Sequence, residues 1–134
     1  MAKLKVELVT PERRVLSVQA DEAIVPGAQG LFGVRSGHTP FLSLMEPGVL
    51  TLKEGASAQS YFIAGGFVEV ANDRILVLAD QAEPLAAIDV SGAKQRLDAA
   101  QERLKGMSVE DARFAIETAT VRRETARMVA AGRR

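Results

Sequence analysis

Residues 1–83 alternate apolar and polar positions over short stretches, the pattern of strands with one buried face. Lys3–Leu8 shows it most clearly. Turn residues such as Pro47-Gly48 and Asn72-Asp73 interrupt the pattern about every ten residues, which is typical of an antiparallel β-sandwich or flattened barrel. The expected strands are 3–8, 15–18, 22–25, 40–45, 49–52, 61–64, 67–70 and 74–78.

The pattern changes to a helical one near Glu83-Pro84. Asp89 is the predicted N-cap of a first helix, because its carboxylate can accept from free amides of the first turn. Gly106 is the predicted end of that helix, in a left-handed conformation. The apolar stripe of this helix consists of Ala93, Leu97, Ala100 and Leu104.

A second helix is predicted from Val109 to about Ala131, capped by Ser108 with Asp111 three residues later. The short link makes the two helices antiparallel neighbours. The chain is therefore expected to be α+β, with a β-sandwich over 1–84 and a helical hairpin over 85–134. The second helix shows two apolar stripes, one of Ala112, Ile116 and Ala119 and one of Phe114, Val121 and Met128.

This hairpin is expected to be marginally stable, because its seam is rich in alanine. A buried leucine contributes about 2 kcal/mol and a methyl group about 0.8 kcal/mol. Marginal elements are the ones that change state. Extended end to end, its roughly 40 helical residues would reach about 60 Å at 1.5 Å per residue.

Composition narrows the class of protein. The chain has 134 residues, of which 47% are apolar and 25% charged, as in ordinary globular domains. It contains no cysteine and one histidine, His38, so disulfides, thiolate metal sites and His-rich metal sites are excluded. We expect no metal and no required cofactor. Charges at Lys3, Lys5 and Glu7 argue against a signal or transit peptide, and no apolar run is long enough to span a membrane.

Charge is divided unevenly along the chain. Residues 1–84 carry 7 basic and 10 acidic side chains, whereas 85–134 carry 10 basic and 7 acidic ones. Five arginines lie between Arg122 and Arg134, beside the single acid Glu124. They are either a solvated helix end that suits the helix dipole or a docking surface for an acidic partner or a phosphate.

No catalytic constellation is found. His38 has Ser36 and Thr39 nearby, but the segment reads more simply as a structured turn with a hydrogen-bonding side chain. The glycines at 27, 30 and 33 match neither a dinucleotide-binding fingerprint nor a P-loop, and are expected to be turn glycines. The chain has one tyrosine, five phenylalanines and no tryptophan, a poor supply of stacking platforms for nucleic acid. We therefore expect no catalytic residues and no nucleic-acid partner.

Three segments together resemble the epsilon subunit of the F-type ATP synthase. Residues 27–40 read GAQGLFGVRSGHTP and are similar to its glycine-rich G-H-x-P segment. Residues 63–70 read IAGGFVEV and are similar to its G-G-x-x-E-V strand pair. Residues 76–83 read LVLADQAE and are similar to its V-L-A-D-x-A-E run. The segments occur in the family's order and at its separations.

The resemblance implies a non-catalytic subunit of the rotating central stalk, peripheral to the cytoplasmic face of a bacterial plasma (inner) membrane and not inserted in it. The sandwich would bind the gamma subunit and the ring of c subunits, with Gly30, Leu31, Phe32 and His38 at the contact, and would couple rotation to proton transport. The hairpin would either fold on the sandwich or extend towards the alpha/beta catalytic head and restrain ATP hydrolysis. Arg122, Arg123 and Arg127 would then face an acidic segment of the head.

Two departures from the family pattern matter. Leu31 stands where some members carry a carboxylate towards the c-ring, so salt is expected to affect this junction little. Residues 88–93 read IDVSGA, and Gly92 stands where an ATP-binding motif of some bacterial members has arginine. The loss of a charge-assisted phosphate contact argues against ATP as a regulatory ligand. The residues of a reduced ATP site would be Glu83, Asp89 and Arg122.

Two other classes remain open from the residues themselves. One is a free-standing ligand-binding β-sandwich with a helical tail, which would be a monomer indifferent to a gamma subunit. The other is an enzyme, which would need a pocket that gathers His38 with a carboxylate.

Overall fold

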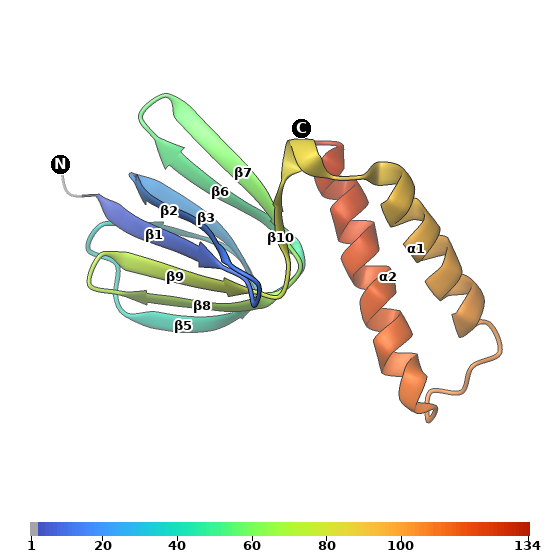
Figure 1. Ribbon diagram of the computed structural model, residues 1–134. Coiled ribbons are helices and arrows are strands. Elements are labelled where there is room, and N and C mark those ends of the chain that lie inside the picture. Colours follow the sequence, from blue (N-terminus) through green and yellow to red (C-terminus); the bar gives the residue numbers. More distant parts are fainter. Residues whose placement is uncertain (1–2) are drawn as a thin grey trace. The chain divides into compact units, whose positions relative to one another are not determined.

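The computed structural model describes residues 3–134, which form two compact units with the boundary between Pro84 and Leu85 (Figure 1). The first unit consists of strands and the second of helices. This arrangement confirms the expected α+β fold class.

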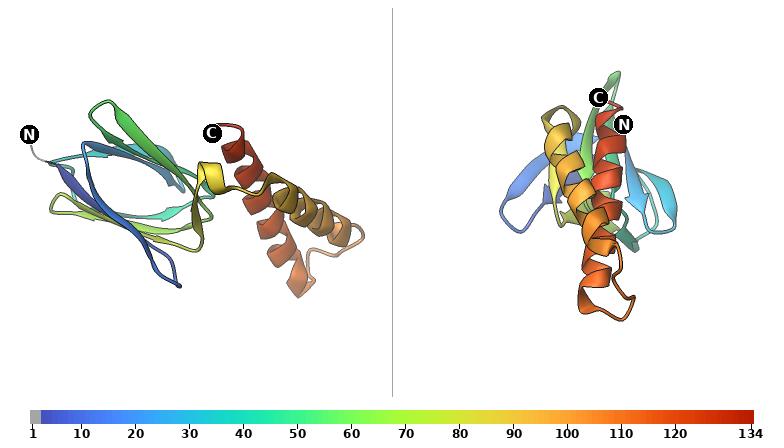
Figure 2. Two further views of the ribbon diagram at one scale, coloured as in Figure 1. Left: turned by 45° about the horizontal axis from the view of Figure 1, so that its top comes forward. Right: turned by 90° about the vertical axis from the view of Figure 1, so that its right-hand side faces the viewer.

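Within residues 3–84, the first unit has ten strands in one continuous sheet, in the order β10-β7-β6-β3-β5-β8-β9-β1-β2, with β4 paired to β3. All pairs are antiparallel except β1 with β9, which run parallel. The sheet curves around one interior as a flattened barrel (Figure 2). The strands are β1 (Leu4–Val9), β2 (Arg14–Ala20), β3 (Glu22–Gly27), β4 (Gly30–Arg35), β5 (Phe41–Met45), β6 (Gly48–Glu54), β7 (Ser57–Ile63), β8 (Gly66–Ala71), β9 (Arg74–Ala79) and β10 (Ala82–Pro84).

The core follows from the alternation seen in the sequence. In β1 every second residue is buried, and Leu4, Val6 and Leu8 are fully enclosed. The same rule places one face of each neighbouring strand inside. The core is completed mainly by Val25, Val34, Leu50, Leu52, Ile63, Val68, Val70, Ile75 and Val77.

Two strands do not follow from the sequence pattern. The glycine-rich stretch contains β4, which pairs with β3 from Glu22↔Arg35 to Gly27↔Gly30. The strand expected over 22–25 therefore ends two residues later than predicted, at Gly27. Pro26 lacks an amide hydrogen, yet its carbonyl accepts from Glu46 N at 2.9 Å, so the strand continues through it. The three-residue β10 was also missed.

The predicted hairpin turn at Asn72-Asp73 is confirmed. Both residues have positive φ, 53° and 57°, as a two-residue turn between β8 and β9 requires. At the start of β8, Gly66 has φ +129°, and a Cβ there would lie 2.0 Å from the Leu78 carbonyl oxygen. Only glycine allows β8 and β9 to approach this closely.

The second unit contains a short 3-10 turn, η1 (Leu85–Ala87), and two helices, α1 (Val90–Leu104) and α2 (Ala112–Ala131), which lie side by side in both Figures 1 and 2. Asp89 caps α1 as predicted, with its carboxylate accepting from Gly92 N at 3.0 Å. Gly106 has φ +73°, the left-handed conformation expected after α1. Among the described residues, no helix is long and apolar enough to cross a membrane.

The start of α2 was predicted wrongly. Asp111 is the N-cap, since its carboxylate accepts from Arg113 N at 2.8 Å, and the connection extends over 105–111. Ser108 instead accepts from Glu110 N within this connection. The stripe of Ala112, Ile116 and Ala119 is exposed. The buried positions of α2 include two glutamates, which no apolar pattern could indicate.

We predict that Gly66→Ala lowers the free energy of unfolding of the β unit by about 3 kcal/mol or more, because the new Cβ meets backbone in a strained conformation. Urea unfolding followed by far-UV circular dichroism measures this change. Gly33→Ala is the matched control: its Cβ would meet only the end of the Glu22 side chain, at 3.2 Å, and we expect a change within about 1 kcal/mol. Equal losses for the two variants would contradict the role given to Gly66.

Candidate partner-binding surfaces

The glycine-rich segment and β5 form a shallow hollow of about 210 Å³. Phe32 and Phe41 meet edge to face there, with ring centroids 5.2 Å apart, and the His38 ring lies 6.3 Å from Phe41. A Cβ at Gly27 would lie 2.8 Å from the Phe32 ring, so glycine makes room for that ring. The hollow is lined by Gly27, Gln29, Gly30, Leu31, Phe32, His38, Phe41 and Ser43, a set that brings together all four residues predicted at this contact.

Leu31 is 70% exposed at the rim of this hollow. Its neighbour Gly30 has φ +119°, which lets the chain reverse between β3 and β4, and Leu31 follows the turn as a paired residue of β4. An exposed apolar side chain beside aromatic rings offers a partner a contact by burial and not by charge.

The segment 36–38 is held in place by Asp73, from the β8–β9 turn. The Asp73 carboxylate accepts from Gly37 N at 2.7 Å and from Ser36 Oγ at 3.2 Å. His38 Nδ1 lies 2.6 Å from the Thr39 carbonyl oxygen, which can only accept, so Nδ1 carries the proton. His38 is thus a hydrogen-bonded turn residue, as its sequence context suggested.

A second surface lies on the outer face of β5, β8, β9 and β1. The register aligns Leu44 with Phe67, Phe67 with Leu78 and Leu78 with Val9, so that one apolar row crosses four strands. Leu44, Phe67 and Leu78 are each between 44% and 56% exposed. Contiguous apolar surface of this kind is typical of an interaction site.

The next row on the same face is mixed in character. It consists of Leu42, Glu69, Leu76 and Glu7, aligned across the same strands. Leu42 is 66% exposed and adjoins the apolar row. The apolar row and Leu42 are called the outer apolar face below.

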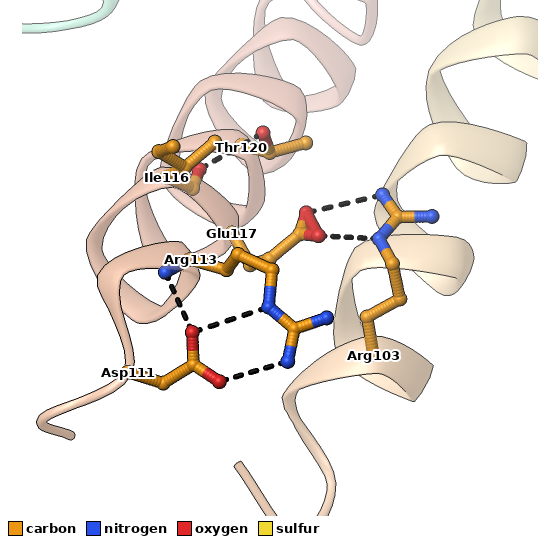
Figure 3. Close-up of polar contacts among 6 residues, drawn as sticks. All are labelled: Arg103, Asp111, Arg113, Ile116, Glu117 and Thr120. Carbon is orange, nitrogen blue, oxygen red and sulfur yellow. Dashed lines mark hydrogen bonds and ion pairs between the residues drawn. The ribbon is translucent and has the colours of Figure 1, made fainter. Parts of the chain in front are cut away.

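The seam of the helical hairpin is partly polar. Ala93 and Ala100 of α1 are buried, as predicted. Opposite them, α2 buries Glu117 and Glu124. Arg103 of α1 forms a two-pronged ion pair with Glu117, its Nη2 donating to Oε1 at 3.1 Å (Figure 3).

The three arginines predicted as a docking cluster are not equivalent. Arg123 and Arg127 both donate to the Glu124 carboxylate, at 2.9 and 3.1 Å. Arg127 is buried, whereas Arg122 is exposed on another side of α2. The cluster as a whole therefore does not face solvent in this arrangement of the helices.

The ion pairs lower the pKa values of acidic side chains in the hairpin. The Arg103 guanidinium lowers the pKa of Glu117, chiefly through its hydrogen bonds. Burial raises the pKa of Glu124, but hydrogen bonds from Arg123 and Arg96 outweigh it, so that pKa is lowered overall. Arg113 and the backbone amide at the cap lower the pKa of Asp111 to about 2 (Figure 3).

The residues of the predicted reduced ATP site lie in both units. Glu83 belongs to β10 and pairs with Phe62 of β7, while Asp89 and Arg122 belong to the helical unit. Asp89 is already engaged as the α1 cap, and a Cβ at Gly92 would lie 2.6 Å from its carboxylate. Among the described residues no group of acids and histidines could hold a metal ion.

Comparison with known proteins agrees with this architecture. The sequence model of the family described as "ATP synthase, Delta/Epsilon chain, beta-sandwich domain" matches residues 3–85. A Myxococcus xanthus protein named ATP synthase epsilon chain is 72% identical over 131 residues, covering 98% of this chain and 96% of the relative.

The chain belongs to the ATP synthase epsilon chain family. An epsilon chain from Geotalea uraniireducens is 44% identical over 131 residues, covering 98% of this chain and 95% of the relative. An epsilon chain is a subunit of ATP synthase and is not its catalytic chain. The resemblance stated from three short segments is thereby confirmed.

Two solved structures share the fold of this epsilon chain. A chain in the structure of Euglena gracilis mitochondrial ATP synthase, described as OSCP/F1/c-ring, has a TM-score of 0.82 at 22% identity, covering 97% of this chain and 82% of that one. A chain in the Tetrahymena thermophila central stalk/c-ring structure has a TM-score of 0.60 at 14% identity, covering 95% and 97%. At these identities the match concerns the fold.

Sequence reasoning missed several residues of the candidate surfaces and of the hairpin seam. The outer apolar face had a readable signal, since 41–45 and 75–79 are almost continuously apolar, as in strands covered on both faces. The role of Asp73 had no readable signal in the sequence, because Gly37, whose amide it accepts from, lies 36 residues away. Glu117 and Glu124 stood out only as acids within a basic helix.

We predict that helical stability falls as the pH drops below about 4.5. A carboxyl whose pKa is lower in the folded chain than in the unfolded chain stabilises the fold fully when the pH is above the unfolded-state pKa. This contribution is lost as the pH falls through the folded-state pKa. Thermal unfolding of the full chain, followed by far-UV circular dichroism between about pH 7 and pH 3, measures the loss. Glu117→Gln should flatten the profile, since it removes one of the shifted acids.

Glu102→Gln is the control for this measurement. It removes an exposed carboxylate that pairs with Lys105 at 3.0 Å on the same helix end, and should leave the profile unchanged. A Glu117→Gln profile as steep as that of the unmodified chain would show that the Arg103 ion pair does not govern the acid response.

Proposed function

We propose that this epsilon chain is a rotor subunit of the ATP synthase central stalk, in which the β unit binds the gamma subunit and the c-ring. The observation that carries the proposal is that the β unit has two separate exposed apolar surfaces, the outer apolar face and the Leu31 hollow. The related folds occur in structures described as F1/c-ring and central stalk/c-ring, which supports a place in the central stalk beside the c-ring. Coupling of rotation to proton transport would follow from holding the two together.

The outer apolar face is assigned to the gamma subunit. It extends over three neighbouring strands, with three large apolar side chains aligned over β5, β8 and β9. A broad face suits a partner that turns with the epsilon chain, because burial of apolar area gives a durable contact. The Leu31 hollow, with Gly30, Phe32 and His38, is assigned to the c-ring.

The hairpin is assigned to regulation of ATP hydrolysis by the catalytic alpha/beta head. Its helices carry a net basic charge, and Arg122 is exposed on α2. The head would supply an acidic segment to Arg122, Arg123 and Arg127 once the hairpin extends. The proposal gives ATP no regulatory role, because Gly92 lacks the motif arginine and Asp89 serves as a helix cap.

The bacterial relatives, such as those of Myxococcus and Geotalea, support a place on the plasma (inner) membrane. We propose that the chain sits peripherally at its cytoplasmic face as part of the complex.

Phe67→Ser and Leu78→Ser should each weaken binding to a purified cognate gamma subunit about tenfold, because each removes roughly 1–2 kcal/mol of apolar burial. Surface plasmon resonance measures the change. Leu31→Ser is the matched control, with an exposed apolar side chain elsewhere on the unit, and should leave gamma binding intact while weakening retention of the c-ring.

Because the contacts are apolar, raising salt from about 0.05 to 0.5 M should change the affinity for gamma and for the c-ring less than threefold. Weakened gamma binding by Leu31→Ser alone would reverse the assignment.

The regulatory role is tested with an ATP synthase core depleted of its epsilon subunit. Adding back the full chain should inhibit ATP hydrolysis, whereas residues 1–84 should bind without inhibiting. Arg122→Glu should relieve a large part of the inhibition, since an exposed charge is reversed. Lys94→Glu, on the exposed side of α1, controls for net charge. Binding without inhibition by either form would keep the stalk role and remove the regulatory one.

A further inference from the structure

Glu124 is the most enclosed ionisable group described in the hairpin, with none of its surface exposed. Its carboxylate accepts from three arginines: Arg96 Nε at 3.0 Å, Arg123 Nε at 2.9 Å and Arg127 Nε at 3.1 Å. A buried carboxylate is tolerated only when charge and hydrogen bonds compensate it. Arg96 belongs to α1, and the other two arginines belong to α2, so this one acid joins the helices.

A second ion pair repeats the arrangement two turns away. Arg103 of α1 pairs with Glu117 of α2 (Figure 3). Arg96 and Arg103 are seven residues apart, as are Glu117 and Glu124, so each pair of like residues lies on one face of its helix. The antiparallel helices are thus joined at two levels by guanidinium–carboxylate contacts.

Apolar packing in this seam is weak by comparison. The fully buried apolar residues of α1 are Ala93 and Ala100, which offer little area for burial, while Leu97 and Leu104 of the same stripe are only half-buried. The buried side chains of α2 at the same levels are the two glutamates. Charged contacts therefore contribute directly to holding α1 on α2.

We propose that Glu124 is an autoinhibitory latch. Glu124 holds α1 through Arg96 and at the same time neutralises Arg123 and Arg127, two of the three arginines assigned to the catalytic head. The part of this proposal that concerns the head rests on the proposed function. An acidic segment of the head would compete with Glu124 for the same guanidinium groups. The hairpin then opens only when an acidic segment of the head is close enough to bind these arginines in place of Glu124.

The latch is tested first on the isolated full chain. The chain has no cysteine, so Gln95→Cys on α1 and Thr125→Cys on α2, both exposed, accept one spin label each. Distance distributions by pulsed electron paramagnetic resonance then report the separation of the helices. Glu124→Gln keeps the side-chain volume but leaves three cations around a neutral amide, and should raise the population at long distances about tenfold or more.

Arg96→Gln removes the α1 arm of the latch and leaves Glu124 paired within α2, so it should also populate long distances. Asp98→Asn is the matched control, because it breaks an exposed ion pair with Lys94 on α1 at 3.0 Å and should leave the distribution unchanged. Circular dichroism checks that the helices persist. Unchanged distances in both Glu124→Gln and Arg96→Gln would overturn the proposal. If circular dichroism shows that Glu124→Gln unfolds the helices, Arg96→Gln still tests the proposal, because the Arg96 side chain is half exposed.

The depleted ATP synthase core separates the latch from the proposed function. Glu124→Gln should inhibit hydrolysis more strongly than the unmodified chain at equal occupancy, and more strongly than Arg96→Gln, which opens the hairpin without freeing the α2 arginines. Longer distances with unchanged inhibition would retain the conformational latch and reject both the head-docking role and the autoinhibitory part of the proposal.

Discussion

Strands β5, β8 and β9 carry apolar side chains on both faces, while the barrel has one interior to cover them. Val68, Val70 and Val77 are enclosed, and Phe67 and Leu78 on the same strands remain half exposed. Exposed apolar rows of this kind are costly in water and favour association. The β unit is thus built as part of an assembly, which agrees with its membership of a family of ATP synthase subunits.

The helical unit uses the opposite principle. Its seam adds guanidinium–carboxylate contacts to packing that fully buries only alanines on α1, with Glu124 enclosed between the helices. Apolar burial is non-directional and persistent, whereas an ion pair can be exchanged for an equivalent one offered by a partner. A permanent contact on the β unit and an exchangeable one on the hairpin fit the two roles proposed for this chain.

Much of the fold could be predicted because its signals are local. Alternation placed most strands, Asn72-Asp73 supplied the turn geometry of a hairpin, and Asp89 supplied a helix cap. Where the prediction was wrong, a longer-range contact decided in one case and a choice between two local caps in the other. Strand β3 continues through Pro26 because Glu46 N donates to its carbonyl, and α2 starts late because Asp111 and not Ser108 caps it.

The sequence by itself determined the two-part fold, the turns and the family, since periodicity, turn chemistry and short motifs act over a few residues. Only the tertiary structure decided which side chains meet. The outer apolar face exists because the register sets Leu44, Phe67 and Leu78 in one row. The latch exists because packing brings Arg96 to Glu124, 28 residues away. Strand register and ion-pair partners depend on distant parts of the chain, where local sequence carries no signal.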